Sequence, residues 1–343
     1  MLNQTRLLYI LLILPLFSVA QIGGKATYQF LNLVSSARQA SLGGKVISVK
    51  DDDVNFATWN PALINSGMDG KLAFNYVDYF SDVNYGSVAY AHSFDSLGTF
   101  VAGVTFVDYG KFIKATEYGE EEGQFSANEL ALNVGYSYQI DSSWTVGANA
   151  KIINSVLDSW NSYGAAVDLG VTYFMPEKDM MLALVLRNAG MQLKAYSGHD
   201  KENEKLPFEI QFGISQVLEH LPLQWSVTFE NLQKLDLSFS NPSFSTSSLE
   251  GEEIEEEVSI LNKAVRHVVI GAELFPKRNF SVRGSYNFRR AAEMRLANYK
   301  YFGGFSFGFG MKVKKFRINY GRSLYHPAGG TNHFSIVTDL DEF

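Results

Sequence analysis

Carboxylates and histidines are the residue types in this chain that could bind a metal ion. Asp51, Asp52 and Asp53 could offer oxygen ligands to a hard cation. Consecutive carboxylates, however, point in divergent directions and lack the spacing of a known metal-binding loop. The histidines also show no metal-ligand spacing; they are scattered as His92, His199, His220 and His267. The triplet is therefore interpreted as a turn or a solvated surface, and we predict neither a metal site nor a cofactor.

His333 and Ser335 stand two positions apart near the C-terminal end. A His and Ser pair also serves the lipid A deacylases of outer membranes. If Phe334 and Ile336 face lipid, however, both polar groups face the opposite side, away from any acyl chain. The chain contains no Cys, so thiol chemistry and disulfides are excluded. We therefore expect a protein that is not an enzyme.

The composition indicates a folded protein without a nucleic-acid partner. Of the 343 residues, 46% are hydrophobic and 14% aromatic, which is enough to build a core. The net charge of −7 is concentrated in one acidic run, and the rest of the chain is nearly neutral; that run contains Glu250, Glu252, Glu253, Glu255, Glu256 and Glu257. Such a run repels itself, so we interpret it as a solvated loop.

The N-terminus has the pattern of a signal peptide. Arg6 precedes the apolar run "LLYILLILPLF", and Ser18-Val19-Ala20 offers small residues for cleavage. We assign residues 1–20 to this signal. No later apolar run approaches the roughly 18 residues of a membrane-spanning helix. Asn60-Pro61-Ala62 is the tripeptide of water channels, but those channels are built from such helices, so that interpretation is excluded.

Alternation with period two runs through the rest of the chain. In residues 130–140, Leu130, Leu132 and Val134 alternate with Ala131 and Asn133. One face of each such segment is large and apolar, and the other is small and polar. Most segments have about nine to eleven residues, the length that a tilted strand needs to cross a bilayer.

Fourteen such segments can be counted, an even number that suits a single-chain outer-membrane barrel: 71–79, 84–94, 98–107, 126–140, 144–155, 163–174, 181–189, 208–215, 223–232, 265–274, 280–288, 303–312, 316–323 and 331–340. Long connections at 108–125, 190–207, 233–264 and 289–302 are expected at one end and short turns at the other. In a soluble β-sandwich the polar faces would be rich in Lys and Glu. Here they are rich in Gly, Ser, Asn, Thr and Ala, which suits a crowded lumen.

We therefore predict an all-β fold: a 14-stranded antiparallel transmembrane β-barrel over residues 71–343, integral to the outer membrane. Both termini should be periplasmic and the long loops extracellular. Residues 21–70 lack the alternation yet are rich in apolar side chains, so we expect them to form a plug against or inside the lumen. The residues that we assign to this plug are Phe56, Trp59, Asn60, Pro61, Ala62 and Leu63. Asn60-Pro61 is interpreted as a turn from the plug to the wall.

Several stretches, in order over the mature chain, resemble the PorV/PorQ family of the type IX secretion system: "GGKATYQFLNLVSSARQASLGGK", "DDDVNFATWNPALI", "YGKF", "GQFSANE", "LPFEI" and "GGFSFGFG". The "WNPALI" element alone is shared across barrels that resemble fatty-acid transporters of the FadL type. The resemblance implies a 14-stranded barrel with an N-terminal hatch, found in Bacteroidota. It also implies a non-catalytic role with PorZ, and with PorU and PorV of the complex that processes and attaches secreted cargo at the cell surface.

Two functions of different classes remain open. A platform for a surface protein needs only an outer surface that a partner can bind, and the family resemblance favours it. A FadL-like transporter of hydrophobic small molecules needs a ligand site and a route past the plug. For a platform, loops that mix aromatic and basic residues are the expected partner or lipopolysaccharide contacts: Tyr196, Arg289, Arg290, Arg295, Tyr299 and Tyr301.

Overall fold

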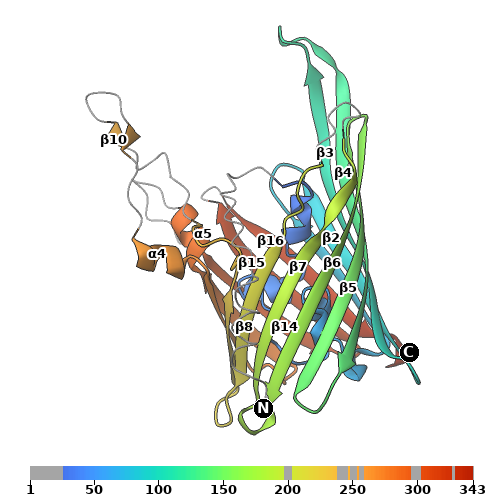
Figure 1. The fold of residues 1–343 in the computed structure, drawn as a ribbon, viewed down its shortest axis with the longest axis vertical. Helices are drawn as coiled ribbons and strands as arrows, with labels where there is room; N and C mark the ends of the chain where they lie inside the picture. Colours follow the sequence, from blue (N-terminus) through green and yellow to red (C-terminus); the bar gives the residue numbers. More distant parts are fainter. Residues whose placement is uncertain are drawn as a thin grey trace, which may run out of the picture.

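The computed structural model describes residues 26–196, 203–237, 246–247, 253–254, 259–294, 303–326 and 329–342. The signal peptide assigned to residues 1–20 lies outside these ranges. Fourteen strands form one closed antiparallel barrel (Figure 1), in which β1 pairs with both β2 and β16. The barrel strands are β1 Lys71–Asp78, β2 Asn84–Phe94, β3 Gly98–Ala115, β4 Glu121–Gln139, β5 Trp144–Leu157, β6 Trp160–Met175, β7 Met180–Lys194, β8 Glu209–Val217, β9 Leu223–Phe229, β12 Val268–Leu274, β13 Phe280–Asn287, β14 Phe305–Val313, β15 Phe316–His326 and β16 Gly329–Asp339.

These strands confirm the predicted 14-stranded barrel and its two-faced pattern. On β4, Leu132 and Val134 are 47% and 54% exposed, whereas Asn133 between them is buried. On β14, Phe307 is half exposed and Ser306 is buried. Large apolar side chains thus point out of the barrel on successive strands, as a wall in contact with lipid requires. In the described part of the chain, no helix is long and apolar enough to cross a membrane.

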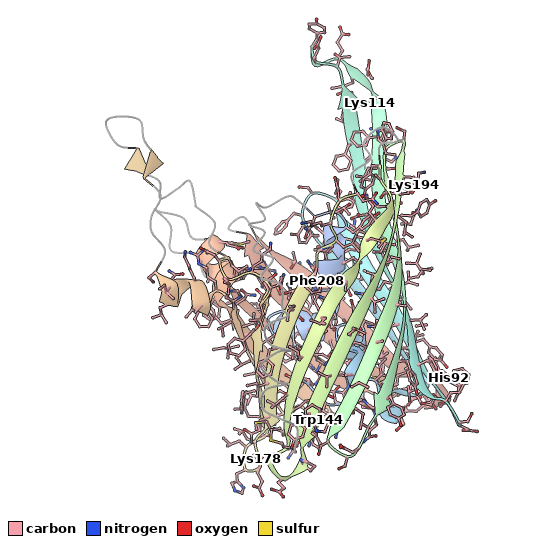
Figure 2. The ribbon with its side chains drawn as sticks, in the orientation of Figure 1. His92, Lys114, Trp144, Lys178, Lys194 and Phe208 are labelled. Carbon is pink, nitrogen blue, oxygen red and sulfur yellow. The ribbon has the colours of Figure 1, made fainter. Side chains whose placement is uncertain are left out.

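The barrel has one tall side and one low side. The expected loop 108–125 is instead a continuation of the β3–β4 hairpin, where Phe112 pairs with Phe125 and their rings lie 5.1 Å apart. This stretch lacks the apolar alternation because it extends beyond the lipid-facing wall. β3 and β4 have 18 and 19 residues, but β9 and β12 have 7 each. Figure 2 shows Lys114 high on the tall side, and Trp144 and Lys178 at the opposite end.

Short helical elements and one small hairpin lie in the connections between the barrel strands. The connection between β9 and β12 contains the small hairpin of β10 (Thr246–Ser247) and β11 (Glu253–Ile254), followed by α4 (Ile260–Val265). The connection after β13 begins with α5 (Phe288–Glu293). At the end with short turns lie η4 (Pro176–Lys178) and η6 (Leu340–Glu342). The described elements of these two connections, β10, β11, α4 and α5, therefore lie at the same end as the β3–β4 hairpin tip.

The N-terminal segment lies inside the barrel as a series of short turns. Its elements are η1 (Gln29–Asn32), α2 (Ala37–Ser41), α3 (Val54–Ala57), η2 (Pro61–Leu63) and η3 (Ser66–Met68). α2 packs against β13 to β16, and η2 packs against β4 to β6. The segment therefore spans the lumen from one side of the wall to the other. The chain joins the wall at Gly70, whose φ of 67° suits glycine and whose carbonyl accepts from the Leu340 N–H.

We predict that Leu132→Arg destabilises the barrel by about 2–4 kcal/mol, because it places a charge on the lipid face of β4. Ile113→Arg is the matched control. Ile113 is also exposed, but it lies on the β3 extension beyond the wall, so a cost below about 1 kcal/mol is expected. Urea titration of folding into lipid vesicles measures both values. Equal costs at the two positions would contradict the assigned lipid boundary.

Candidate functional site

The Asn60-Pro61-Ala62 tripeptide forms a self-satisfied turn inside the barrel. The Asn60 side-chain oxygen accepts from the Ala62 N–H at 3.0 Å, and its amide donates to the Ile47 carbonyl at 2.7 Å. Asn60 is fully buried, and Pro61 occupies the first position of η2, where a missing N–H costs nothing. The tripeptide is therefore a turn within the plug, several residues before the junction with the wall at Gly70.

Two glycines of the wall receive this turn. Gly147 on β5 and Gly170 on β6 face each other across the strand pair. A Cβ at Gly147 would lie 2.4 Å from the Pro61 carbonyl carbon, and one at Gly170 would lie 2.2 Å from the Asn60 side-chain oxygen. No other residue type fits at such distances. The wall is thus shaped to the plug backbone at this point.

The aromatic plug residues contact buried cations. The guanidinium carbon of Arg187 on β7 lies 3.7 Å from the centroid of the Trp59 ring, and that of Arg38 lies 5.0 Å from the Phe56 ring. Leu63 is buried in an apolar cluster with Phe56. Together with the turn described above, all six residues assigned to the plug by sequence lie buried within it.

Arg38, in α2, connects the plug to the opposite side of the wall. Its guanidinium is buried and lies 2.9 Å from Glu273 on β12 and 3.2 Å from Asp53 in the plug, and it also pairs with Asp51. Glu273 in turn binds Arg283 on β13 at 2.8 Å. Burial acts to lower the pKa of Arg38, but the surrounding carboxylates raise it well above its ordinary value. The guanidinium therefore stays charged.

The acidic triplet is thereby accounted for without a metal ion. Besides binding Arg38, Asp53 accepts from the Asn55 N–H at 3.1 Å and caps α3. The exposed Asp52 pairs with Lys71 at the start of β1. Within the described ranges, no group of three or more His, Asp or Glu side chains could hold a metal ion. Asp51 and Asp53 are therefore ion-paired inside the plug, which corrects their interpretation as a solvated surface, whereas Asp52 lies at a solvated surface of the plug as expected.

His333 and Ser335 face the lumen, as their alternation with Phe334 and Ile336 predicts. Both are buried, whereas Phe334 and Ile336 are 48% and 44% exposed. The Ser335 hydroxyl accepts from the Ala37 N–H at 2.8 Å, at the start of α2. His333 Nε2 lies 2.9 Å from the Thr331 hydroxyl. The pair therefore contacts the plug and its own strand rather than lipid.

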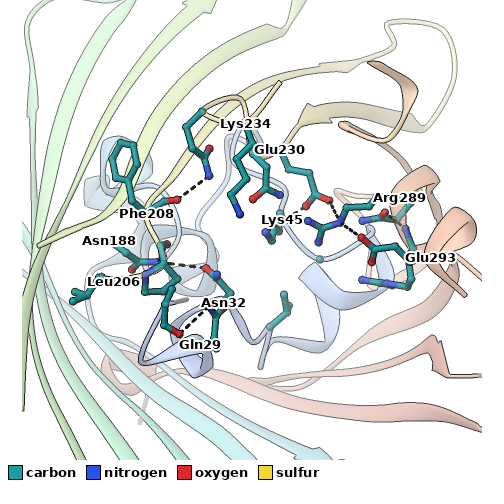
Figure 3. A pocket seen from close by; sticks show the side chains of 18 of the residues that line it. Gln29, Asn32, Lys45, Asn188, Leu206, Phe208, Glu230, Lys234, Arg289 and Glu293 are labelled. Atoms are coloured by element: carbon teal, nitrogen blue, oxygen red, sulfur yellow. Dashed lines mark hydrogen bonds and ion pairs between the residues drawn. The ribbon is translucent and has the colours of Figure 1, made fainter. Parts of the chain in front are cut away.

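A polar basin of about 790 Å³ opens above the plug at the end with the long connections (Figure 3). Lys45 of the plug lies at its base, 2.8 Å from Glu209 and 3.4 Å from Glu230. Glu230 also pairs with Arg289 of α5 at 3.4 Å, and Arg289 reaches Glu293 at 3.7 Å. We call this set of five side chains the basin ion chain; it links plug, wall and outer loop.

Electrostatics favour the charged forms of Glu230 and Arg289 in the basin ion chain. Burial acts to raise the pKa of Glu230, but the cations Lys45 and Arg289 hold it below its ordinary value. Glu230 correspondingly raises the pKa of Arg289. Lys205, Lys234 and Arg290 also line the basin, so its charge is positive although the chain as a whole is acidic.

The predicted partner-contact residues are only partly described. Arg289 and Arg290 lie in the basin, where Arg290 donates to the Ser306 hydroxyl at 3.3 Å. Tyr196 is turned inward: its hydroxyl donates to Ser155 at 2.6 Å and its ring lies 6.5 Å from that of Tyr28. The other three candidates lie outside the described residues; they are Arg295, Tyr299 and Tyr301. The described members are therefore part of an internal network rather than free loop tips.

Sequence reasoning missed the charged residues that hold the plug. Arg38, Lys45, Arg187, Glu209 and Glu273 are all largely buried. The wall members among them stand on the small, polar face of their strands. A charge at such a position must be neutralised from inside the barrel, and a survey of lumen-facing charges would have identified them.

Comparisons with known proteins find similarity to this chain in its fold and not in its sequence. No model of a protein family matches it, and no curated protein matches it in sequence. The toluene transporter TbuX of Ralstonia pickettii is 14% identical with a TM-score of 0.51, covering 90% of this chain and 98% of its own. The toluene transporter TodX of Pseudomonas putida is 14% identical with a TM-score of 0.52, covering 89% and 97%.

A FadL homologue of Pseudomonas aeruginosa is 11% identical with a TM-score of 0.49, covering 90% of this chain and 99% of its own. At these identities the similarities to TbuX and TodX show a shared fold, that of the closed barrel described above. They support that fold and not the narrower resemblance to the PorV/PorQ family, which stays a prediction.

We predict that Gly170→Val displaces the plug and raises the ion conductance of the barrel, because its side chain would occupy the position of the Asn60 oxygen. The matched control is Gly284→Val on β13, where an added Cβ meets nothing within 4 Å. Planar-bilayer recordings measure the conductance. Both variants should retain the heat-modifiable mobility of an assembled barrel on gels. A conductance of Gly170→Val as low as that of the control would show that this contact does not hold the plug.

Proposed function

We propose that this chain is a non-catalytic outer-membrane barrel with a sealed lumen that anchors a protein at the cell surface. The observation that carries the proposal is the plug, which buried ion pairs and glycine contacts fasten to opposite sides of the wall. A lumen held shut from both sides suits a scaffold better than a conduit. By the resemblance of its sequence, the chain belongs with the type IX secretion system, where it holds a PorZ-like partner and supports the PorU and PorV attachment complex.

The cavities between plug and wall also support the platform over transport. One measures about 40 Å³ and has Lys151, Arg187 and Asn133 among its lining residues. Another measures about 250 Å³ and is lined mostly by charged residues such as Arg38 and Lys71. A benzene-sized ligand binds in an apolar cavity of about 150 Å³. Charged cavities are poor sites for a hydrophobic molecule, because the buried ions would lose solvation without gaining a partner.

The second candidate is a FadL-like transporter of hydrophobic small molecules. The structural neighbours favour this function over the secretion role, since TbuX and TodX are both toluene transporters. The support is at the level of fold alone. In such a transporter the plug would have to move, and the contacts of Arg38 and Gly170 would have to break in each cycle.

Uptake by proteoliposomes separates the two candidates. For the platform we expect no uptake of toluene or a long-chain fatty acid by the wild-type barrel above that of empty liposomes. The Gly170→Val variant, with its displaced plug, is the open control. Uptake by the wild type that saturates with substrate concentration would establish the transporter instead.

The platform also fixes an orientation, with both termini periplasmic and the basin extracellular. We predict that Cys placed at Tyr118, which is 85% exposed at the tip of the β3–β4 hairpin, reacts with an impermeant maleimide on intact cells. Cys at Ser142, at the other end of β4, should react only after the outer membrane is opened. Because the natural chain has no Cys, each signal comes from one site. The reverse labelling pattern would invert the topology.

Partner anchoring is expected to depend on the basin and its adjoining loop. We predict that replacing Arg289, Arg290 and Arg295 with Ala, or Tyr299 and Tyr301 with Ser, releases the surface partner into the medium while the barrel still assembles. The matched control replaces Lys277 and Arg278 with Ala in the short turn between β12 and β13, at the opposite end of the barrel. Immunoblots of whole cells against culture medium follow the partner. Release by the control and not by the basin variants would place the contact elsewhere.

A further inference from the structure

The small cavity between plug and wall is lined by a buried guanidinium, that of Arg187, which makes no direct ion pair among the described residues. The plug contributes Ser35 and Thr58 to its lining, and the wall contributes Asn133, Lys151 and Arg187. The three wall residues lie on β4, β5 and β7 and are all buried. The cavity thus lies between two parts of the plug and three strands of the wall.

Arg187 is incompletely satisfied at this position. It is 2% exposed, and one terminal nitrogen donates to the Leu31 carbonyl at 3.2 Å while the guanidinium lies over Trp59. Its Nε and second terminal nitrogen are buried and find no acceptor among the described residues. The side-chain nitrogen of Asn133 is likewise buried and finds no acceptor among the described residues. Buried donors of a charged group left in this way are costly.

The neighbouring carboxylates are engaged by other cations. Glu209 stands opposite Arg187 in the β7–β8 register, yet both of its oxygens accept from Lys45, at 2.8 and 2.9 Å. Asp168 is 2.7 Å from Lys151. The direct contacts of these two carboxylates are thus made with lysines, and Arg187 makes no direct ion pair with either of them. Glu230, the next carboxylate along, is shared between Lys45 and Arg289.

We propose that this cavity binds a chloride ion, held by the unpaired nitrogens of Arg187 and Asn133. A water molecule needs at least about 10–15 Å³ of such space, so a cavity of about 40 Å³ admits a monatomic anion. The unpaired groups that line it are hydrogen-bond donors. Donors bind an anion and repel a cation. The bound ion neutralises Arg187 and links the plug at Trp59 to the wall. This site is independent of whether the barrel anchors a partner or transports a molecule.

Bromide replaces chloride and can be located directly by X-ray diffraction. Crystals of the wild-type barrel grown without halide and soaked in sodium bromide should show an anomalous peak within hydrogen-bonding distance of Arg187 Nε. The measurement needs no variant and so does not depend on folding of a mutant. Density for water alone in the cavity, with no anomalous peak, would overturn the proposal.

Thermal unfolding in detergent tests the energetic role of the ion. The midpoint should rise with chloride concentration at fixed ionic strength, with gluconate as the replacement anion. At a chloride concentration one hundred times the dissociation constant, the ratio of folded to unfolded protein should increase about 100-fold. Equal midpoints in chloride and gluconate would overturn the proposal.

Variants assign the effect to the site. Arg187→Gln should abolish the chloride dependence. The matched control is Arg283→Gln, which also removes a buried guanidinium, but one already paired with Glu273. It should lower the midpoint and retain the dependence. If Arg187→Gln retained the full chloride response, the ion would act elsewhere; if that variant failed to fold, the bromide measurement would decide.

Discussion

The burial of charge inside a closed wall is the constraint on which the rest of this structure depends. A barrel in lipid satisfies its backbone by pairing strands in a ring, and its lumen must then be filled by groups that satisfy one another. Arg38 does this for the plug, since its guanidinium meets Glu273 from the wall and Asp53 from its own segment. Breaking one partner of such a buried pair costs about 3–5 kcal/mol. The plug is therefore fixed by electrostatics as much as by packing.

Close backbone contact completes what the ion pairs begin. The glycine pair of β5 and β6 lets the Asn60 turn approach the wall, while Asn60 satisfies its own polar atoms within the plug. The ion pairs of Arg38 lie near β12 and β13. The close contact of the Asn60 turn with the glycine pair lies on the other side of the lumen. A plug held at two separated points resists rotation as well as translation. That rigidity gives the basin above it a firm base, with Lys45 joining the two.

Local periodicity explains why the wall could be predicted from the sequence. In each strand, the alternation of large apolar and small polar residues shows which side meets lipid, as Leu132 and Asn133 illustrate on β4. The β3–β4 extension was not predicted, because a strand outside the membrane does not need an alternation of apolar and polar residues.

The contacts of the plug were not predicted for a different reason. Asp51 and Asp53 look like a solvated run until Arg38 is placed beside them, and Tyr196 looks like a loop tip until Ser155 is found beneath it. Such pairings are properties of three-dimensional proximity, which one sequence does not encode locally.

The span of these contacts along the chain has a consequence for biogenesis. The Ala37 N–H finds its acceptor 298 residues later, and Arg38 finds Glu273 after 235 residues. The chain is synthesised from the N-terminus, so the plug is made before any of the wall that will neutralise it. Contacts of such long range form slowly, because a large loop must close first. During that interval the apolar and charged groups of the plug are shielded only by whatever binds the unfolded chain. The plug precedes the wall in the chain, yet it is thus among the last segments to reach its final surroundings.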